Sequence, residues 1–346
     1  MERKEILLGK SPAELQQLCA ELGFPKFTAK QIALWLYGKK ARSIEAMTDL
    51  SAKNRLLLAE HAEIGCAEPL SEQSSQDGTR KFLFATQGTA KKAAPKSIES
   101  VYIPEADRAT LCVSCQSGCK MNCGFCATGS QGFNHSLQVH EILNQYYSIP
   151  ETDAVKNIVY MGMGEPFDNI DAVLKSLEVM TSPWGFAWSP YRITVSTVGI
   201  LPGLRRFLDE SSCHLAVSLH NPFPEERAHL MPMEKAYPVA ETIDLLHRYD
   251  WHGQRRVSFE YILMKDYNDS PFHAKAVVKL LKGLNCRVNL ISYHEVPGKP
   301  FRKTDSEHTA RFQEILQENG IICTLRKSRG EDIMAACGLL AKTKGN

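Results

Sequence analysis

The sequence lacks any apolar run that is long enough to cross a membrane. A membrane-spanning helix needs about 18 or more consecutive apolar residues, and no stretch of the 346-residue chain reaches that length. The first residues, MERKEILLGKSPAEL, also lack the apolar region and the small-residue cleavage site of a signal peptide. These absences predict a cytoplasmic protein, and a hydrophobic content of 43% predicts a sizeable buried core.

A large excess of charge of one sign is missing too. The 41 Lys and Arg residues nearly balance the 39 Asp and Glu residues, which leaves a net charge of +2. The chain therefore does not have the character of a general polyanion binder, and any surface for nucleic acid must be a local patch. One basic group in the N-terminal part is interpreted either as an ordinary solvated face or as a contact for RNA phosphates. It comprises Lys26, Lys30, Lys39, Lys40 and Arg42.

Cysteine, in contrast, is dense in one stretch. Eleven cysteines are present, and three of them form the spacing Cys119-x3-Cys123-x2-Cys126. In a reducing compartment, cysteines serve as metal ligands, nucleophiles or buried apolar residues rather than as disulfides. Thiolates are soft ligands that select iron–sulfur clusters, zinc or copper(I). Three cysteines on one short loop can bind three irons of a four-iron cluster and leave the fourth iron open for a small molecule.

A zinc ribbon is the alternative interpretation of the same loop. Cys112-x2-Cys115 and Cys123-x2-Cys126 form two pairs with CxxC spacing. Only seven residues separate the two pairs, whereas the pairs of a ribbon are roughly 15–20 residues apart. The spacing therefore favours the iron–sulfur interpretation.

The N-terminal 65 residues carry signals for helix starts. Ser11 as cap, Pro12 at the first helical position and Glu14 form a capping box, and the pair Thr28 and Gln31 repeats the pattern. Further helices are expected within residues 43–49 and from Ser51 onward. We expect residues 1–65 to form a helical RNA-binding accessory domain. Residues 66–108 are expected to form a β-hairpin linker, in which a Lys-, Ala- and Gly-rich turn joins the strands RKFLFAT and SIESVYIP.

From residue 109 onward, six β-branched apolar segments alternate with amphipathic ones. Such alternation predicts an α/β fold with a parallel sheet and right-handed crossovers, here a partial (β/α)6 barrel over residues 109–300. Residues 301–346 are expected to form a C-terminal helix and loop. Barrel enzymes carry their chemistry at the C-terminal ends of the strands. The candidate residues at those ends are Gly164, Glu165, Ser196, Ser218, His220 and His294.

A single cysteine, Cys337, stands near the C-terminal end of the chain in the segment RGEDIMAACGLLA. Its small neighbours leave the sulfur open to close approach. Arg326, Lys327 and Arg329 precede it, and these cations would lower the pKa of its thiol if they lie near it in space. An inert cysteine is the ordinary alternative at such a position.

Together these motifs resemble the RlmN/Cfr family of radical S-adenosylmethionine (SAM) RNA methyltransferases over nearly the full chain. The resemblance rests on the cluster loop followed by a (β/α) chain, on VYMGMGEPFDN, ITVSTVGI and AVSLHNP, and on the terminal AACG. Cys112 and the run IPEADRATLCVS favour the branch that methylates C2 of adenine over the branch that methylates C8.

The resemblance implies a [4Fe-4S] cluster bound by Cys119, Cys123 and Cys126, with SAM chelated by the open iron and cleaved to a 5′-deoxyadenosyl radical. The implied substrates are adenines of 23S ribosomal RNA and, next to the anticodon, of transfer RNA. The implied partners are these RNAs and an electron donor such as flavodoxin, for a protein that acts as a monomer away from membranes. The implied SAM contacts are Gly164, Glu165, Ser196, Ser218, Leu219, His220 and His294.

The resemblance also implies a mechanism with two reactive cysteines and two SAM molecules per turnover. C2 of adenine has no nucleophilic lone pair, so a carbon radical is needed to form the new bond. Cys337 would accept a methyl group from the first SAM, and the radical made from that S-methyl group would add to C2. Glu99 would accept the C2 proton. Cys112 would then attack the Cys337 sulfur and release the methylated RNA, leaving a disulfide that a reductant must reopen.

Two residues depart from the family pattern. Cys115 stands where the family usually has Ser, which makes it a neutral neighbour, an alternative ligand or a disulfide partner. His294 replaces an expected Asn among the SAM contacts. Two alternative functions remain beside C2 methylation: adenine C8 methylation, and, in a different class, zinc-dependent RNA binding without catalysis.

Overall fold

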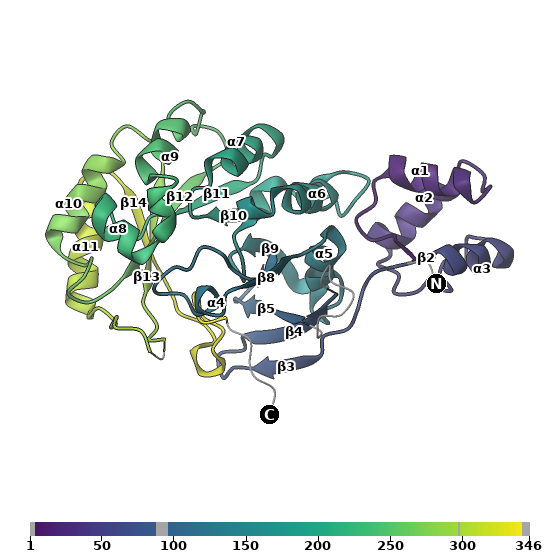
Figure 1. Ribbon diagram of the computed structural model, residues 1–346, viewed down its shortest axis with the longest axis horizontal. Coiled ribbons are helices and arrows are strands. Elements are labelled where there is room, and N and C mark those ends of the chain that lie inside the picture. Colours follow the sequence, from purple (N-terminus) through teal and green to yellow (C-terminus); the bar gives the residue numbers. More distant parts are fainter. Residues whose placement is uncertain (1–3, 88–95, 297, 341–346) are drawn as a thin grey trace.

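The computed structural model describes residues 4–87, 96–296 and 298–340, and its main feature is one ten-stranded sheet (Figure 1). The strand order is β14-β13-β12-β11-β10-β9-β6-β5-β4-β3. Seven of these strands run parallel to one another and form the open barrel. They are β6 (Ala109–Cys112), β9 (Val155–Tyr160), β10 (Ile193–Thr197), β11 (His214–Ser218), β12 (Val257–Leu263), β13 (Arg287–Ser292) and β14 (Ile322–Arg326).

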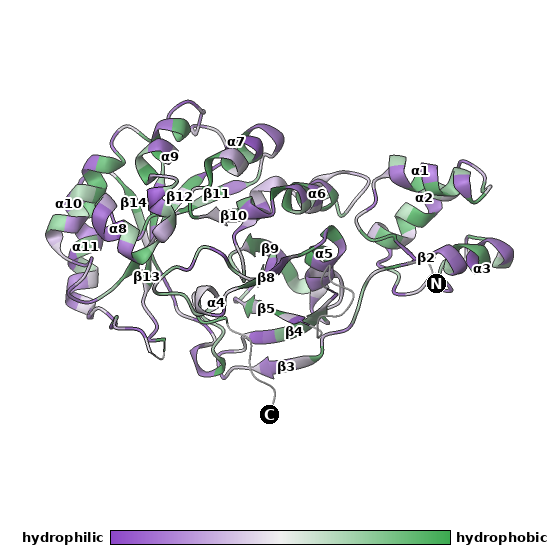
Figure 2. Cartoon of the chain, in the orientation of Figure 1, coloured by the Kyte–Doolittle hydropathy of each residue, from purple (hydrophilic) through white to green (hydrophobic). Residues whose placement is uncertain are grey.

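Helices connect and cover the parallel strands. Their bounds follow the amphipathic segments expected from the sequence, and Figure 2 shows hydrophobic and hydrophilic residues alternating along them, as expected for helices that cover a sheet. The larger ones are α5 (Val139–Tyr147), α6 (Ile170–Thr181), α7 (Leu201–Glu210), α9 (Val239–Leu246), α10 (Pro271–Leu280) and α11 (Ser306–Glu318). The short ones are α4 (Ala127–Ser130), α8 (Pro224–Leu230), η2 (Thr152–Ala154), η3 (Pro166–Asp168), η4 (Pro190–Arg192), η5 (Pro232–Lys235) and η6 (Glu331–Ile333).

The α/β fold is confirmed, and the barrel has one more strand than the six that were expected. The segment Ile322–Arg326 follows α11 and pairs in parallel with β13. Its side chains are mostly exposed or half-exposed, with Cys323 the buried one, so the segment lacks the apolar run that identifies the other strands. This added strand brings the C-terminal segment, and Cys337 with it, back to the barrel.

The predicted hairpin strands are present, but they extend the barrel sheet instead of forming a separate ribbon. β3 (Ser71–Ser74), β4 (Arg80–Thr86) and β5 (Lys96–Pro104) are antiparallel to one another. β5 also pairs antiparallel with β6, with Val101 opposite Cys112. The turn that was expected between the two strands falls in residues 88–95, outside the described part of the chain.

The N-terminal part is helical, as predicted, with two local corrections. It contains α1 (Pro12–Glu21), α2 (Thr28–Ala33), the π-helix η1 (Leu34–Gly38) and α3 (Ala52–His61), with a two-residue ladder between β1 (Glu5–Ile6) and β2 (Ala62–Glu63). The Ser11 capping box forms as predicted. Thr28 is the first helical residue instead of the cap. Residues 43–49 form bends and turns closed by short-range bonds such as Met47 N–H to Ile44 O, because the segment is too short to nucleate a helix.

The N-terminal helices pack on the barrel through aromatic side chains. The ring of Tyr37, in η1, lies 5.6 Å from that of Trp184 and 5.4 Å from that of Phe186, both edge to face. On the barrel side, Tyr146 of α5 contacts Phe186 and Trp188 edge to face. The segment around Trp184 is therefore a packing element. Among the described residues, no helix is long and apolar enough to span a bilayer.

Candidate active site at the C-terminal ends of the strands

The cysteine loop leaves the barrel at the end of β6 and is held by backbone bonds on both sides. β7 (Gln116–Gly118) pairs with β8 (Phe133–Ser136), and Cys119 N–H donates to Gly132 O. Gly118 has a φ of +78°, and a Cβ there would lie 1.9 Å from Gly132 O, so only glycine permits this turn. Gly124 N–H donates to Leu230 O, which ties the loop to the C-terminal end of α8.

The three predicted ligands all line one cavity, here called the cluster cavity. It has a volume of about 150 Å³ and opens between the cysteine loop and the strand ends. Burial raises the pKa of Cys119 to about 12 and also raises the pKa of Cys123 well above its usual range. Thiols in such surroundings ionise only when a cation compensates the thiolate charge, which iron supplies. The cluster cavity is lined by Cys119, Cys123, Cys126, Gly164, Glu165, Ser196, Ser218 and His220, among others.

Three thiolates that line one cavity fit the donor set of a four-iron cluster. Within the described ranges, no three Cys, His, Asp or Glu side chains are grouped as the ligands of one metal ion must be. A four-iron cluster does not require such convergence, because each sulfur binds a different iron. Cys115 also lies close by, buried against the turn after β9, where its backbone N–H donates to Met163 O.

Glu165 and Gly164 form the wall of the cluster cavity at the end of β9. One carboxylate oxygen of Glu165 accepts hydrogen bonds from Thr197 Oγ1 at 2.7 Å and Phe167 N at 3.0 Å, and the other accepts one from Val198 N at 2.9 Å. Burial nevertheless raises its pKa to about 7. A Cβ on Gly164 would lie 2.5 Å from Gln116 Cβ. A buried carboxylate held in this way is a site for a cationic group such as an ammonium.

The end of β11 supplies the next wall. Ser218 and His220 line the cluster cavity, whereas Leu219, the residue between them, is buried with no exposed surface and does not line it. Leu219 contributes its backbone, whose N–H donates to Glu260 O. His220 accepts a hydrogen bond at Nδ1 from Ile262 N, and burial lowers its pKa to about 3. The ring is therefore neutral and presents its Nε2 proton.

Cys337 joins the cluster cavity to a second cavity inside the barrel, here called the lumen cavity. The lumen cavity measures about 720 Å³ and is lined by Cys112, Met161, Arg326 and Cys337 together with residues further down the strands. Cys337 and Met161 also line the cluster cavity. The two sulfurs proposed to react, those of Cys112 and Cys337, thus face one space next to the three-cysteine loop.

The pKa values of the two sulfurs correct one expectation. Burial and the nearby Cys337 together raise the pKa of Cys112 to about 12, and Arg326 opposes both. Burial likewise raises the pKa of Cys337 and outweighs the opposing effect of Arg326. The basic residues before Cys337 therefore do not lower its pKa overall. The Cys337 side chain keeps exposed surface, and it lines both the cluster cavity and the lumen cavity. All eleven cysteines are free thiols.

The segment that carries Cys337 is fastened on two sides. The turn between β3 and β4 holds one end: Asp77 accepts from Gly330 N at 3.1 Å, and Asp332 accepts from Ser75 Oγ at 2.5 Å and from Gln76 N at 3.2 Å. Helix α4 holds the other end, where Ala127 N–H donates to Gly338 O. Figure 1 shows this segment, in yellow, passing beside α4 and the end of β3. These contacts on both sides, here called the clasp, hold the Cys337 segment at the C-terminal ends of the barrel strands.

Glu99 and His294 lie away from the cluster cavity. Glu99 shares the face of β5 that carries Val101, the partner of Cys112. Its carboxylate lies 3.3 Å from Lys81 Nζ, and both residues are buried. His294 lines the lumen cavity and not the cluster cavity; its Nε2 lies 2.9 Å from Ser328 Oγ. The structure thus places His294 beside the Cys337 segment.

Two residues of the site were missed by sequence reasoning. Glu260 lies within the apolar strand β12, lines the cluster cavity and accepts hydrogen bonds from Asn289 and Arg326. The one available signal was a carboxylate inside an otherwise apolar strand. Arg227 is buried and donates to the carbonyls of Val198, Ser218 and Leu219 at the ends of β10 and β11.

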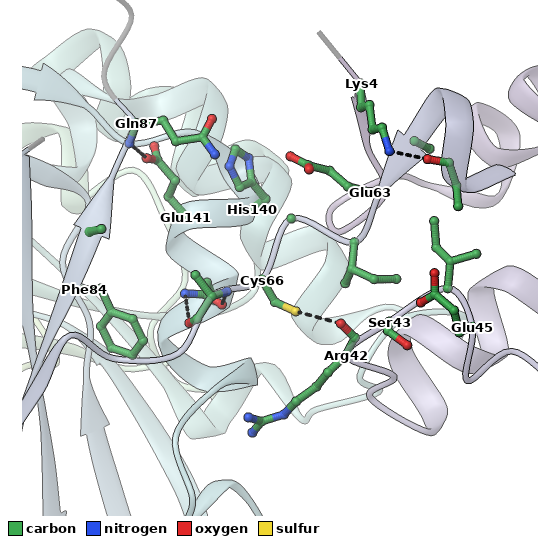
Figure 3. A pocket seen from close by; sticks show the side chains of 18 of the residues that line it. Lys4, Arg42, Ser43, Glu45, Glu63, Cys66, Phe84, Gln87, His140 and Glu141 are labelled. Atoms are coloured by element: carbon green, nitrogen blue, oxygen red, sulfur yellow. Dashed lines mark hydrogen bonds between the residues drawn. The ribbon is translucent and has the colours of Figure 1, made fainter. Parts of the chain in front are cut away.

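A third cavity, of about 390 Å³, lies between the N-terminal helices and the barrel (Figure 3). The side chain of Asn144 exchanges two hydrogen bonds of 3.0 Å with the backbone of Ala67 at its edge. Arg42, part of the basic group, lines this cavity and pairs with Glu68. Lys39 and Lys40 pair with Asp49 and Asp153, while Lys26 and Lys30 are exposed.

Comparison with known proteins gives a consistent result. A model of the radical SAM superfamily matches residues 113–276, and one of the ribosomal RNA large subunit methyltransferase N-terminal domain matches residues 6–64. A "probable dual-specificity RNA methyltransferase RlmN" of Phocaeicola vulgatus is 55% identical over 99% of this chain and 96% of its own. The dual-specificity RNA methyltransferase RlmN of Syntrophobacter fumaroxidans is 40% identical over 96% of both. The crystal structure of a radical SAM methyltransferase from Sphaerobacter thermophilus is 38% identical, covers 97% of this chain and 99% of that one, and has a TM-score of 0.90.

Proposed function

Since the chain belongs to the RlmN family of radical-SAM RNA methyltransferases, we propose that it methylates C2 of adenine in large-subunit ribosomal RNA and in transfer RNA. The observation that carries the proposal is the arrangement of the sulfurs. Cys119, Cys123 and Cys126 face one cavity, Cys112 faces another, and Cys337 borders both.

The cluster cavity is the site for a [4Fe-4S] cluster and for SAM. Cys119, Cys123 and Cys126 would bind the cluster, which together with SAM supplies an adenosyl radical. Glu165 would hold the SAM ammonium, since its carboxylate is fixed by three hydrogen bonds and carries the charge that an ammonium requires. The remaining proposed SAM contacts are Gly164, Ser196, Ser218, Leu219, His220 and, from the lumen side, His294.

Cys337 would carry the methyl group from SAM to the base. Its sulfur would attack the methyl carbon of a first SAM, so that S-adenosylhomocysteine leaves and the thiol proton is lost. A hydrogen atom of that S-methyl group would then pass to the adenosyl radical made from a second SAM, which leaves a carbon radical on the Cys337 side chain. The radical adds to C2 of an adenine held in the lumen cavity. Because Cys337 borders both cavities, one side chain can reach SAM and the base in turn.

Release of the product would use Glu99 and Cys112. The adduct would lose one electron to the oxidised cluster and the C2 proton to Glu99 on β5, which is the proposed proton acceptor. Cys112 attacks the Cys337 sulfur, which forms a disulfide and breaks the bond between sulfur and the transferred carbon. That carbon takes up a proton and becomes the methyl group of 2-methyladenosine. Before Glu99 takes up the C2 proton, Lys81, whose Nζ lies 3.3 Å from the Glu99 carboxylate, balances the negative charge.

Three further proposals concern partners. An electron donor such as flavodoxin would reduce the site, and a thiol reductant would reopen the disulfide. The protein would act as a monomer. The helical N-terminal part, with exposed Lys26 and Lys30, would hold folded RNA by phosphate contacts.

Nucleoside analysis tests the proposal. RNA from a strain lacking its own adenine methyltransferase is incubated with the reconstituted protein, SAM and a reductant, digested, and analysed by mass spectrometry. The expected product is 2-methyladenosine, and the Cys337→Ala protein, which retains the cluster loop, is the matched control and should give none. Exclusive formation of 8-methyladenosine, or no methyladenosine from a protein that binds iron and SAM, would overturn the proposal.

A further inference from the structure

The opposite end of the barrel carries a basic hollow that the reaction chemistry does not use. An arginine stands directly before or at the start of four parallel strands: Arg108 before β6, Arg192 before β10, Arg256 before β12 and Arg287 at the start of β13. Because the starts of parallel strands meet at one edge of a sheet, all four lie at the N-terminal edge. They surround a hollow of about 590 Å³, here called the basin.

The charged residues among the described lining of the basin are all of one sign. Among the described residues that line it, four are arginines and none is Asp or Glu. Arg108 pairs with Glu105 outside the basin. Within the described part of the chain, Arg192, Arg256 and Arg287 have no carboxylate partner, and the first two are exposed. By contrast, Arg255, beside Arg256, is bonded to the carbonyls of Phe207, Leu208 and Cys213 and serves the fold.

The positive charge of these arginines also contributes to the pKa of a neighbouring histidine, His214. Burial, together with Arg256, Arg255 and Arg287, lowers the pKa of His214 to about 4. His214 accepts a hydrogen bond at Nδ1 from Arg256 N at 3.1 Å and stacks on Tyr191, with ring centroids 5.7 Å apart. Tyr191 is 39% exposed. An exposed aromatic face beside unpaired guanidinium groups is the combination that binds single-stranded nucleic acid.

The basin is continuous with the site of chemistry. Arg108, Tyr191, Arg192, His214 and Arg256 line the basin and also the lumen cavity, whose other end holds Cys112 and Cys337. β6 runs from one end to the other, and the four steps from Arg108 to Cys112 correspond to about 13 Å of strand. A base that reaches the cysteines through this passage must leave its stack, and its backbone then remains at the basin.

We infer that the basin is the mouth through which RNA enters, with the arginines holding the phosphates that flank the target adenosine and Tyr191 stacking on a neighbouring base. This inference rests on the proposed function, because it names the surface that delivers the base to Cys337. It also explains why a protein of nearly balanced charge gathers unpaired arginines at one edge of its sheet.

The test compares three variants with the wild-type protein in binding to an RNA hairpin at several salt concentrations. Arg192→Gln/Arg256→Gln removes two proposed phosphate contacts and should weaken binding about tenfold or more, with a salt slope less steep by about 2. Arg192→Lys/Arg256→Lys keeps the charges and should restore the slope. Arg311→Gln, an exposed arginine on the outer helix α11, is the control and should bind as the wild type does.

Two further readouts keep the inference separate from the proposed function. Tyr191→Ala should weaken RNA binding without changing the salt slope, because stacking releases no counterions. Methylation of Cys337 by SAM in the absence of RNA, followed by protein mass spectrometry, should be the same in the Gln double variant and the wild type. RNA binding of the Gln double variant with wild-type affinity and slope would overturn the inference, whether or not the wild type methylates RNA. A wild-type protein that never methylates Cys337 would overturn the proposed function and leave the binding result to decide on the basin.

Discussion

Replacing Arg227 by Met should destabilise the protein and weaken its affinity for SAM together. The side chain of Arg227 has no exposed surface and pairs with the buried Glu234. Its Nη2 atom donates to Ser218 O at 2.7 Å and to Val198 O at 3.1 Å, and its Nε donates to Leu219 O at 2.9 Å. One guanidinium thus ties the ends of β10 and β11, where the proposed SAM contacts begin.

The size of the stability loss follows from the buried Glu234 carboxylate, which the substitution leaves without its partner. Removing one partner of a buried ion pair costs about 3–5 kcal/mol, because the other charge stays buried without compensation. Arg227→Met/Glu234→Gln removes the stranded charge and keeps an oxygen for Val239 N, which donates to Glu234 at 3.0 Å. The double variant should therefore recover part of the loss. Such a difference between the two variants isolates the charge from the packing.

Urea unfolding followed by circular dichroism measures the stability, and equilibrium dialysis under anaerobic conditions measures SAM binding. Arg255→Met is the matched control, since Arg255 also donates to three carbonyls and has no carboxylate partner among the described residues. It lies just before β12, at the opposite end of the strands. This variant should lose stability without losing SAM affinity beyond that expected from the unfolded fraction. An Arg227→Met protein within about 1 kcal/mol of wild-type stability would refute the reasoning.

Two other predictions concern the same site. Because the pKa of Glu165 is raised to about 7, its carboxylate is protonated below that pH. SAM affinity should fall as the pH falls through 7, by up to about tenfold per unit. Glu165→Gln should bind SAM weakly at every pH, and an equal pH dependence in both proteins would contradict the assignment. Asp77→Ala removes the acceptor for Gly330 N and should increase amide exchange across the Cys337 segment and slow methylation of Cys337. Its melting temperature should fall only modestly, since the hydrogen bonds lost at Gly330 N and Thr79 N are worth about 1 kcal/mol each. Unchanged amide exchange at Gly330 would show that these contacts do not hold the segment.

Local signals in the sequence predicted much of this fold. The capping box of Ser11, the cap at Ser51 and the apolar strands of the barrel depend on neighbours within a few residues. The same holds for the cysteine loop, whose spacing alone brings three sulfurs to one cavity. β14 escaped prediction because only Cys323 of its five residues is buried, so no apolar pattern marks it.

Local sequence patterns could not predict contacts between segments that are far apart in the chain. In the sequence, Arg227 is one more charged residue of an amphipathic segment. Only the fold shows that its guanidinium binds carbonyl groups at the strand ends. Glu260 meets Arg326 across 66 residues of chain. The expected effect of the basic residues on Cys337 failed for the same reason, because burial, which the sequence does not specify, outweighs the nearby charge.

The most direct test of the two-cysteine mechanism is to look for a covalent complex of protein and RNA on a denaturing gel. Cys112→Ala blocks release after the carbon of Cys337 has added to the base, so the complex should accumulate with SAM, reductant and RNA. Cys337→Ala should give no complex under the same conditions, and the wild type should give little. If Cys112→Ala yields no complex while it still binds SAM and methylates Cys337, the assignment of these two sulfurs is contradicted.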